Sequence, residues 1–60
     1  MYSKALELSP EYALVYSNRG DAYIELGEYQ KAIDDCTEAI KLDPVFAFAY
    51  YNRGIAYTLL

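Results

Sequence analysis

The residues with the clearest chemical potential are two adjacent carboxylates, Asp34 and Asp35, and the single cysteine that follows them, Cys36. The sequence contains no histidine, so it lacks the side chain that most often activates a thiol. Adjacent residues on a helix point to different parts of its surface, so the two carboxylates are not expected to face one substrate. We therefore expect no nucleophilic or acid–base catalysis and do not expect an enzyme.

The sequence also gives little support to a metal or cofactor site. One cysteine and no histidine leave no disulfide within the chain and no cysteine or imidazole metal cluster. The glycines Gly20, Gly27 and Gly54 are scattered, so they do not form a glycine-rich phosphate loop. We expect no cofactor and no metal.

Charge and composition restrict the class of partner. The 60 residues contain five Lys or Arg and nine Asp or Glu, for a net charge of −4. Nucleic acids and anionic membranes need clustered cationic side chains, so we expect neither as a partner. A hydrophobic content of 55% indicates a folded chain. The apolar runs at 12–16 and 45–51 are too short to span a membrane, and no targeting segment is visible. We expect a soluble chain, inside the cell, in a compartment that the sequence does not identify.

The strongest pattern is an internal repeat with a period of 34 residues. Aligning 1–26 with 35–60 gives identical residues at eleven of the twenty-six positions. The identical pairs are Ala5/Ala39, Leu8/Leu42, Pro10/Pro44, Ala13/Ala47, Tyr16/Tyr50, Asn18/Asn52, Arg19/Arg53, Gly20/Gly54, Ala22/Ala56, Tyr23/Tyr57 and Leu26/Leu60. A period of this length is typical of repeat proteins built from stacked supersecondary units.

The local signals predict that each unit is a pair of helices, at about 2–8, 11–26, 28–42 and 45–60. Ser9-Pro10 and Asp43-Pro44 each combine a capping residue with a proline suited to the first helical position. Gly27 is suited to end a helix. Gly20 and Gly54 lie within helices, where they are expected to allow close helix packing. The predicted fold class is all-α, an α-solenoid of antiparallel helix-turn-helix repeats.

A unit of this length with these residues resembles the tetratricopeptide repeat. Tyr16, Gly20 and Tyr23 match the pattern of its first helix, helix A. The second helix, helix B, is matched by Ala32, Cys36, Ala39 and Pro44, although Cys36 replaces an aromatic residue and Arg19 and Arg53 replace a leucine. Tyr2, Ala5 and Pro10 match the end of a preceding helix B. The resemblance implies one complete repeat at 13–46, the end of a preceding repeat at 1–12 and the first helix of another at 47–60.

The resemblance implies protein–protein interaction, with helix A side chains lining a concave surface that takes a peptide or a helix. The matching positions are Leu14, Ser17, Asn18, Asp21, Ile24 and Glu25, then Phe48, Tyr51, Asn52, Ile55, Thr58 and Leu59. Asn18 and Asn52 can hydrogen-bond a peptide backbone or carboxylate, unless Asn-Arg-Gly is only a common sequence of this helix. In family members that bind chaperone C-termini, asparagines at this position join lysines and an arginine in a carboxylate clamp. The matching lysine positions hold Leu14 and Phe48 here, so the clamp is incomplete.

The alternative function is self-association. The sequence is expected to hold one whole repeat between two half repeats. Such a chain is expected to be part of a longer array, or to stack or swap its open ends with another copy. The tyrosines Tyr16, Tyr23, Tyr50 and Tyr57 are predicted to lie in the core, whereas Phe48 and Tyr51 are predicted to be exposed contacts. Arg19 and Arg53 are expected to pair with acidic groups such as Asp21 or Asp35, or to lay their aliphatic stems over aromatic rings.

Overall fold

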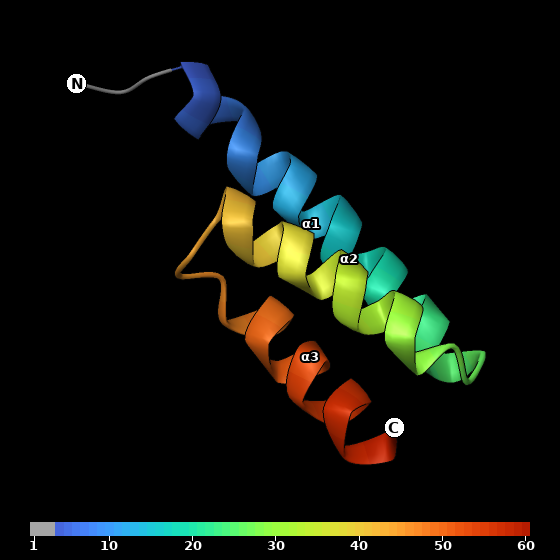
Figure 1. Cartoon of the computed structure of the whole chain (residues 1–60). Helices are drawn as coiled ribbons and strands as arrows, with labels where there is room; N and C mark the ends of the chain where they lie inside the picture. The colour runs from blue at the N-terminus through green and yellow to red at the C-terminus, as the bar shows by residue number, and fades with distance from the viewer. Residues whose placement is uncertain (1–3) are drawn as a thin grey trace.

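The computed structural model describes the backbone of residues 4–60 and the side chains from residue 11 onward. Three helices follow one another, α1 (Lys4–Glu25), α2 (Tyr29–Leu42) and α3 (Ala47–Leu59). Successive helices run antiparallel, and the N-terminal turns of α1 extend past the end of α2 (Figure 1). The expected all-α class is confirmed for these residues, although they form three helices where four were predicted. Within the same range, no helix combines the length and the apolar character needed to cross a membrane.

The predicted break between helices at 2–8 and 11–26 is wrong, because α1 continues through Pro10. A proline within a helix removes one backbone hydrogen bond, and its ring crowds the preceding turn. The ring also holds φ near the helical value, so the helix can continue through it. The Ser9-Pro10 pair therefore starts no new helix. Tyr2 lies outside the described residues, as do the side chains of Ala5 and Pro10, so their match to a preceding repeat stays a prediction.

The turn between α1 and α2 is closed by Gly27, as the sequence predicts. Gly27 has a φ of 79°, in the left-handed region that a glycine adopts without steric cost. Its N–H donates to the Ile24 carbonyl at 3.0 Å, and the Glu28 N–H donates to the Tyr23 carbonyl at 2.8 Å. This pair of bonds is the Schellman arrangement, which satisfies the last carbonyls of a helix. It returns the chain directly along α1.

The second predicted cap, at Asp43-Pro44, is wrong, because α3 begins only at Ala47. Asp43 instead ends α2, where its N–H donates to the Ala39 carbonyl at 2.9 Å. Its own carbonyl accepts from the Phe46 N–H at 3.1 Å, which makes 43–46 a β-turn with proline at its second position. The fixed φ of proline suits that position as well as the first turn of a helix, so the dipeptide alone does not distinguish the two.

The core is built from small side chains with rings packed against them. One cluster takes one alanine from each helix, Ala13, Ala39 and Ala49, and Tyr16, Ile40, Leu42 and Phe46 pack on it. The other contains Ala32, Ile33 and Ala56, with Tyr23, Ile24 and Tyr29 packed on it. The core position that the sequence predicts for four tyrosines is confirmed for Tyr16 and Tyr23, which are partly buried and pack on these clusters. It is wrong for Tyr50 and Tyr57, which are 44% and 57% exposed because no described helix covers that side of α3.

α1 and α2 approach each other closely at Gly20. A Cβ atom built there would lie 2.8 Å from the Cys36 Sγ and 3.4 Å from the Ala32 carbonyl oxygen. The first distance is shorter than van der Waals contact allows, so the helices can meet this closely only because the side chain is a hydrogen atom. Gly54, which occupies the same repeat position in α3, would meet no described atom within 4 Å. The predicted packing role is therefore confirmed for Gly20 alone.

This difference predicts opposite effects of the same substitution at the two glycines. Both changes to alanine gain about 1 kcal/mol of helix propensity, so the difference between them isolates the packing effect. We expect Gly20→Ala to have a free energy of unfolding about 1–3 kcal/mol lower than that of Gly54→Ala, the usual cost of overpacking. Urea unfolding followed by circular dichroism measures both values. Equal values would contradict the close approach at Gly20, and adding Cys36→Ala to Gly20→Ala is expected to restore stability.

Candidate functional site

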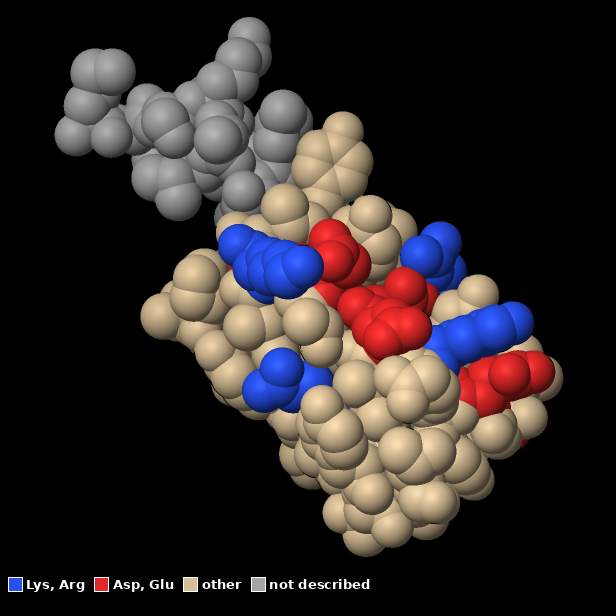
Figure 2. Space-filling view, in the orientation of Figure 1, with Lys and Arg blue, Asp and Glu red and all other residues tan. Residues whose placement is uncertain are grey.

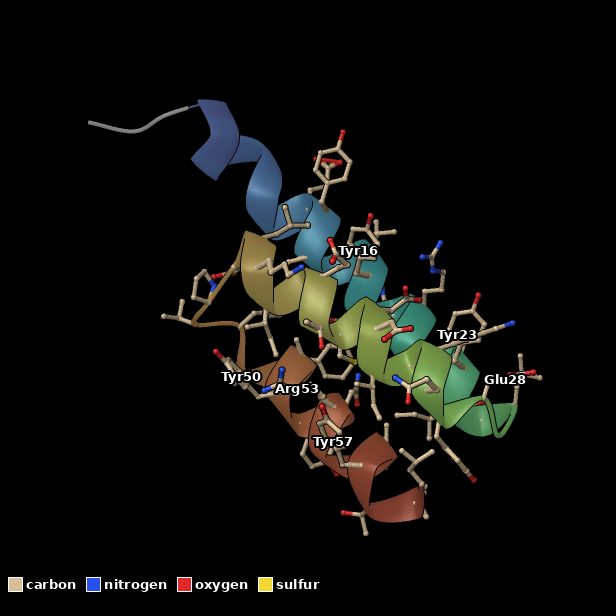
Figure 3. The ribbon with its side chains drawn as sticks, viewed as in Figure 1. Tyr16, Tyr23, Glu28, Tyr50, Arg53 and Tyr57 are labelled. Atoms are coloured by element: carbon tan, nitrogen blue, oxygen red, sulfur yellow. The ribbon has the colours of Figure 1, made fainter. Side chains whose placement is uncertain are left out.

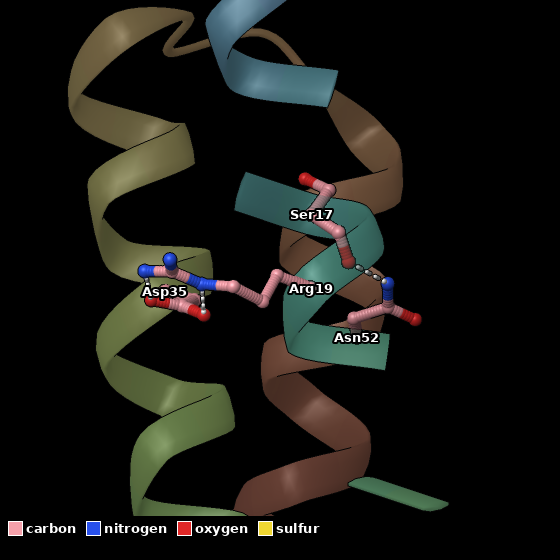
Figure 4. Close-up of polar contacts among 4 residues, drawn as sticks. All are labelled: Ser17, Arg19, Asp35 and Asn52. Carbon is pink, nitrogen blue, oxygen red and sulfur yellow. Dashed lines mark hydrogen bonds and ion pairs between the residues drawn. The ribbon is translucent and has the colours of Figure 1, made fainter. Parts of the chain in front are cut away.

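The ion pair between Arg19 and Asp35 joins α1 to α2. The Arg19 Nε donates to Asp35 Oδ2 at 2.6 Å and its Nη2 donates to Oδ1 at 2.8 Å, a bidentate arrangement (Figure 4). Asp35 is only 7% exposed, so a buried carboxylate receives the two charge-assisted bonds that it needs. The hydrogen bond, followed by the charge of Asp35, raises the pKa of Arg19 above its ordinary value. Of the expected partners of Arg19, Asp35 is therefore the observed one.

Arg19 also covers an aromatic ring, and α3 repeats that arrangement. The Arg19 guanidinium lies 5.4 Å from the centre of the Tyr16 ring, and the Arg53 guanidinium lies 5.5 Å from the centre of the Tyr50 ring. Both distances lie within the range of cation–π attraction. In both α1 and α3 an arginine therefore lies over the tyrosine one turn before it. The sequence analysis expects the aliphatic stems over aromatic rings, and the structure places the guanidinium groups there.

Asn52 lies in the contact between α1 and α3. It is 2% exposed, and its Nδ2 donates to the Ser17 carbonyl at 3.4 Å (Figure 4). Ser17 is fully buried, and its Oγ has no hydrogen-bond partner among the described residues. These two positions from the predicted peptide surface therefore face each other across a helix interface. Asn18, the repeat counterpart of Asn52, is exposed, so the two asparagines differ in environment.

The other predicted peptide contacts reach the surface to different extents. Leu14 and Tyr51 are 47% and 68% exposed, and Phe48 is 36% exposed. Asp21 is exposed and Ile55 is half-buried. The predicted exposure of Phe48 and Tyr51 is confirmed.

A shallow groove of about 510 Å³ runs along α3. It is lined by Tyr50, Tyr51, Gly54, Ile55, Thr58 and Leu59. The groove brings together four residues that the sequence assigns to the peptide surface, and none of those on α1 lines it. Tyr50 and Gly54 were not expected in an exposed site, because the sequence predicts a core position for Tyr50 and close helix packing at Gly54. Arg53 is the sole charge in the sequence of α3, and the surface over this helix is almost entirely uncharged (Figure 2).

The carboxylates of Asp34 and Asp35 and the thiol of Cys36 do not converge on one site. Asp34 is exposed and accepts a hydrogen bond from Gln30 Nε2 at 3.2 Å, whereas Asp35 faces α1. Cys36 is fully buried, and burial, with a smaller contribution from Asp35, raises the pKa of its thiol. A protonated, inaccessible thiol is a poor nucleophile and a poor metal ligand. Within the described part of the chain, no three His, Cys, Asp or Glu residues are grouped to hold a metal ion.

The buried thiol predicts a loss of stability in alkaline solution. An unfolded cysteine ionises near pH 8.5, whereas folded Cys36 keeps its proton to higher pH. Above that value the unfolded state binds fewer protons than the folded state, so the free energy of unfolding falls as pH rises, by at most about 1.4 kcal/mol per pH unit. Urea unfolding between pH 7 and pH 9.5 measures this slope. Cys36→Ala keeps every tyrosine and is expected to lose the thiol's part of the slope; equal slopes would contradict the assignment.

Comparison with known proteins matches the tetratricopeptide repeat to residues 13–46. Outer envelope protein 64, chloroplastic, of Arabidopsis thaliana is 51% identical over 39 residues, which cover 65% of this chain and 7% of that protein. Tetratricopeptide repeat protein 28 of Homo sapiens is 41% identical over 39 residues, which cover 65% of this chain and 2% of that protein. Hsp70-Hsp90 organizing protein of Triticum aestivum is 47% identical over 38 residues, which cover 63% of this chain and 6% of that protein.

The chain therefore spans only a small part of the length of these relatives. No solved structure shows a significant match. The repeat match covers more than half of the 60 residues, and the helix-turn-helix of α1 and α2 has Tyr16, Gly20 and Tyr23 packed against the small residues of the second helix. This chain belongs to the tetratricopeptide repeat family.

Proposed function

We propose that this chain is part of a protein-interaction module that holds a peptide or a helix of a partner protein against α1 and α3. Tetratricopeptide repeats generally mediate protein–protein interaction, and the observation that carries the proposal here is the apolar groove of α3. An exposed apolar surface of this kind is unusual unless something binds to it. We also propose the division into 1–12, 13–46 and 47–60 as repeat boundaries.

The direct contacts in this proposal are the accessible members of the predicted peptide surface. They are Leu14, Asn18 and Asp21 on α1, and Phe48, Tyr51 and Ile55 on α3. Tyr51 is the expected anchor, because exposed aromatic side chains concentrate binding energy and, at 68%, it is more exposed than Tyr50 and Leu59, which also line the groove. Ser17 and Asn52 are buried, so their role in the proposal is to hold α1 and α3 at a fixed spacing.

The chemistry of these residues favours a particular ligand. The groove on α3 is apolar, and the exposed acidic residues Asp21 and Glu25 lie on α1. A peptide with apolar side chains and a cationic residue would complement both features. The name of the wheat relative suggests Hsp70 and Hsp90 as alternative partners. Family members that bind chaperone C-termini use lysines at the positions where this chain has Leu14 and Phe48. These two residues supply no cation, so we propose that chaperone tails are not the ligand.

Fluorescein-labelled decapeptides test this function by anisotropy titration against the whole chain. The panel contains a Leu- and Tyr-rich peptide with two lysines, the same peptide with two aspartates, and the C-terminal decapeptides of Hsp70 and Hsp90. We expect the lysine peptide to bind most tightly. Tyr51→Ala and Ile55→Ala are each expected to weaken its binding about tenfold, since loss of an interface anchor costs more than about 1 kcal/mol.

Tyr12→Ala is the matched control for this experiment, because Tyr12 is 53% exposed and does not line the groove. Its binding is expected to equal that of the unmodified chain. Equal losses in all three variants, or tightest binding by a chaperone tail, would contradict the proposed surface.

Self-association is a second candidate, favoured by apolar side chains exposed at the two ends of α3. Val45 is 86% exposed before this helix, and Leu59 and Leu60 are 50% and 67% exposed at its end. We expect the weight-average mass in sedimentation equilibrium to rise between 10 µM and 1 mM, and Leu59→Ser to suppress the rise. A constant monomer mass over this range would eliminate the candidate.

A further inference from the structure

The Tyr50 ring lines the groove of α3 and is fixed by two contacts within the chain. Figure 3 shows Tyr50 beside the connection between α2 and α3. Its hydroxyl donates to the Pro44 carbonyl at 2.9 Å, and the Arg53 guanidinium lies over the ring, 5.5 Å from its centre. A hydrogen bond at one end and a cation on one side restrict the movement of the ring, although Tyr50 is 44% exposed.

Gly54 leaves open space next to this ring. It follows Tyr50 by four residues, so the two positions are neighbours on the surface of α3. A Cβ atom built at Gly54 would meet no described atom within 4 Å. Side chains on a helix lean toward its N-terminus, so the place that a side chain at position 54 would fill is beside Tyr50. A ligand group that lies over Gly54 can therefore contact the Tyr50 ring.

The hydroxyl groups on either side of this place already donate within the chain. The Thr58 Oγ1 donates to the Gly54 carbonyl at 2.9 Å, as the Tyr50 hydroxyl donates to Pro44. A hydroxyl has only one proton to donate, so neither group is a free donor for a ligand. The residues that line the groove also carry no charge. The surface next to Gly54 therefore favours an uncharged ligand group that packs on an aromatic ring.

We infer that the groove of α3 selects partner peptides with an aromatic side chain, which lies over Gly54 and packs on the Tyr50 ring that Pro44 holds in place. This inference rests on the proposed function and names the side chain that the groove takes. Two aromatic rings in contact attract each other more than their buried area alone accounts for. A ring that is fixed before binding also loses little conformational freedom on binding, which raises affinity. Tyr50 is thus the residue that determines this specificity.

The probes are two fluorescein-labelled decapeptides that differ in one central residue. Both keep the two lysines of the peptide described above and have leucine in place of its tyrosines. The central residue is phenylalanine in one and cyclohexylalanine, which has a similar outline but no aromatic ring, in the other. The ratio of their dissociation constants therefore isolates the aromatic contact. In anisotropy titrations of the whole chain, we expect the phenylalanine peptide to bind about three- to tenfold more tightly.

Two variants of Tyr50 separate its ring from its hydroxyl. Tyr50→Leu removes the ring and is expected to bring the ratio to about one, whereas a general loss of structure would weaken both peptides equally and leave the ratio unchanged. Tyr50→Phe keeps the ring but not its bond to Pro44, and it is expected to bind the phenylalanine peptide about threefold more weakly. This second variant decides the case in which Tyr50→Leu binds neither peptide.

Tyr57→Leu and Tyr57→Phe are the matched controls. They make the same changes at a tyrosine of α3 that is 57% exposed and does not line the groove. Both are expected to keep the affinities and the ratio of the unmodified chain. Far-UV circular dichroism of all four variants checks that the helices are retained.

The results distinguish this inference from the proposed function. If both peptides bind the unmodified chain equally, or if Tyr50→Leu keeps the preference or Tyr50→Phe the full affinity, the inference is wrong and the proposed function stands. If no peptide of either panel binds, the proposed function is contradicted and the inference with it. A second copy of the chain is the other possible occupant of the groove. Sedimentation equilibrium without peptide would then show a dimer that Tyr50→Leu dissociates, and this result would also overturn the inference.

Discussion

The close contact between α1 and α2 at Gly20 is the constraint on which the rest of the structure depends. With only a hydrogen atom at this position, the Sγ of Cys36 and the backbone at Ala32 can lie against α1. The same approach brings the Asp35 carboxylate within reach of the Arg19 fork. A wider separation would leave a buried carboxylate without its partner, which is among the most costly changes in a protein interior. Small side chains and the ion pair thus require each other.

The same pattern has a different outcome on α3 because no described helix covers it. Tyr16 and Tyr23 are partly buried core residues, whereas Tyr50 and Tyr57 are exposed. The stacked arginine is present in both copies, so this local geometry does not depend on the covering helix. The exposed copy carries the ring, the positive charge and the open glycine that the covered copy uses in its helix interface.

Much of the fold could be predicted from particular residues. The repeat identified the all-α class and the family, Gly27 located the turn after α1, and Phe48 and Tyr51 were correctly expected at the surface. The proline signals failed at both sites, since Pro10 continues a helix and Pro44 lies in a turn. A proline restricts φ to a value shared by helices and turns, so the dipeptide that contains it does not by itself show which of the two is formed. Within the candidate site, the sequence did not reveal that Ser17 and Asn52 are buried.

The sequence by itself determined the helical class, the repeat period and the residues that each helix presents at equivalent positions, because these follow from local conformational preference and from spacing along the chain. Only the tertiary structure decided which equivalent residues are covered. Ser17 and Asn52 became buried against each other, and Tyr50 and Gly54 became part of an open groove. Burial depends on which helix lies opposite, and two closely similar local sequences with different neighbours in space therefore acquire different environments.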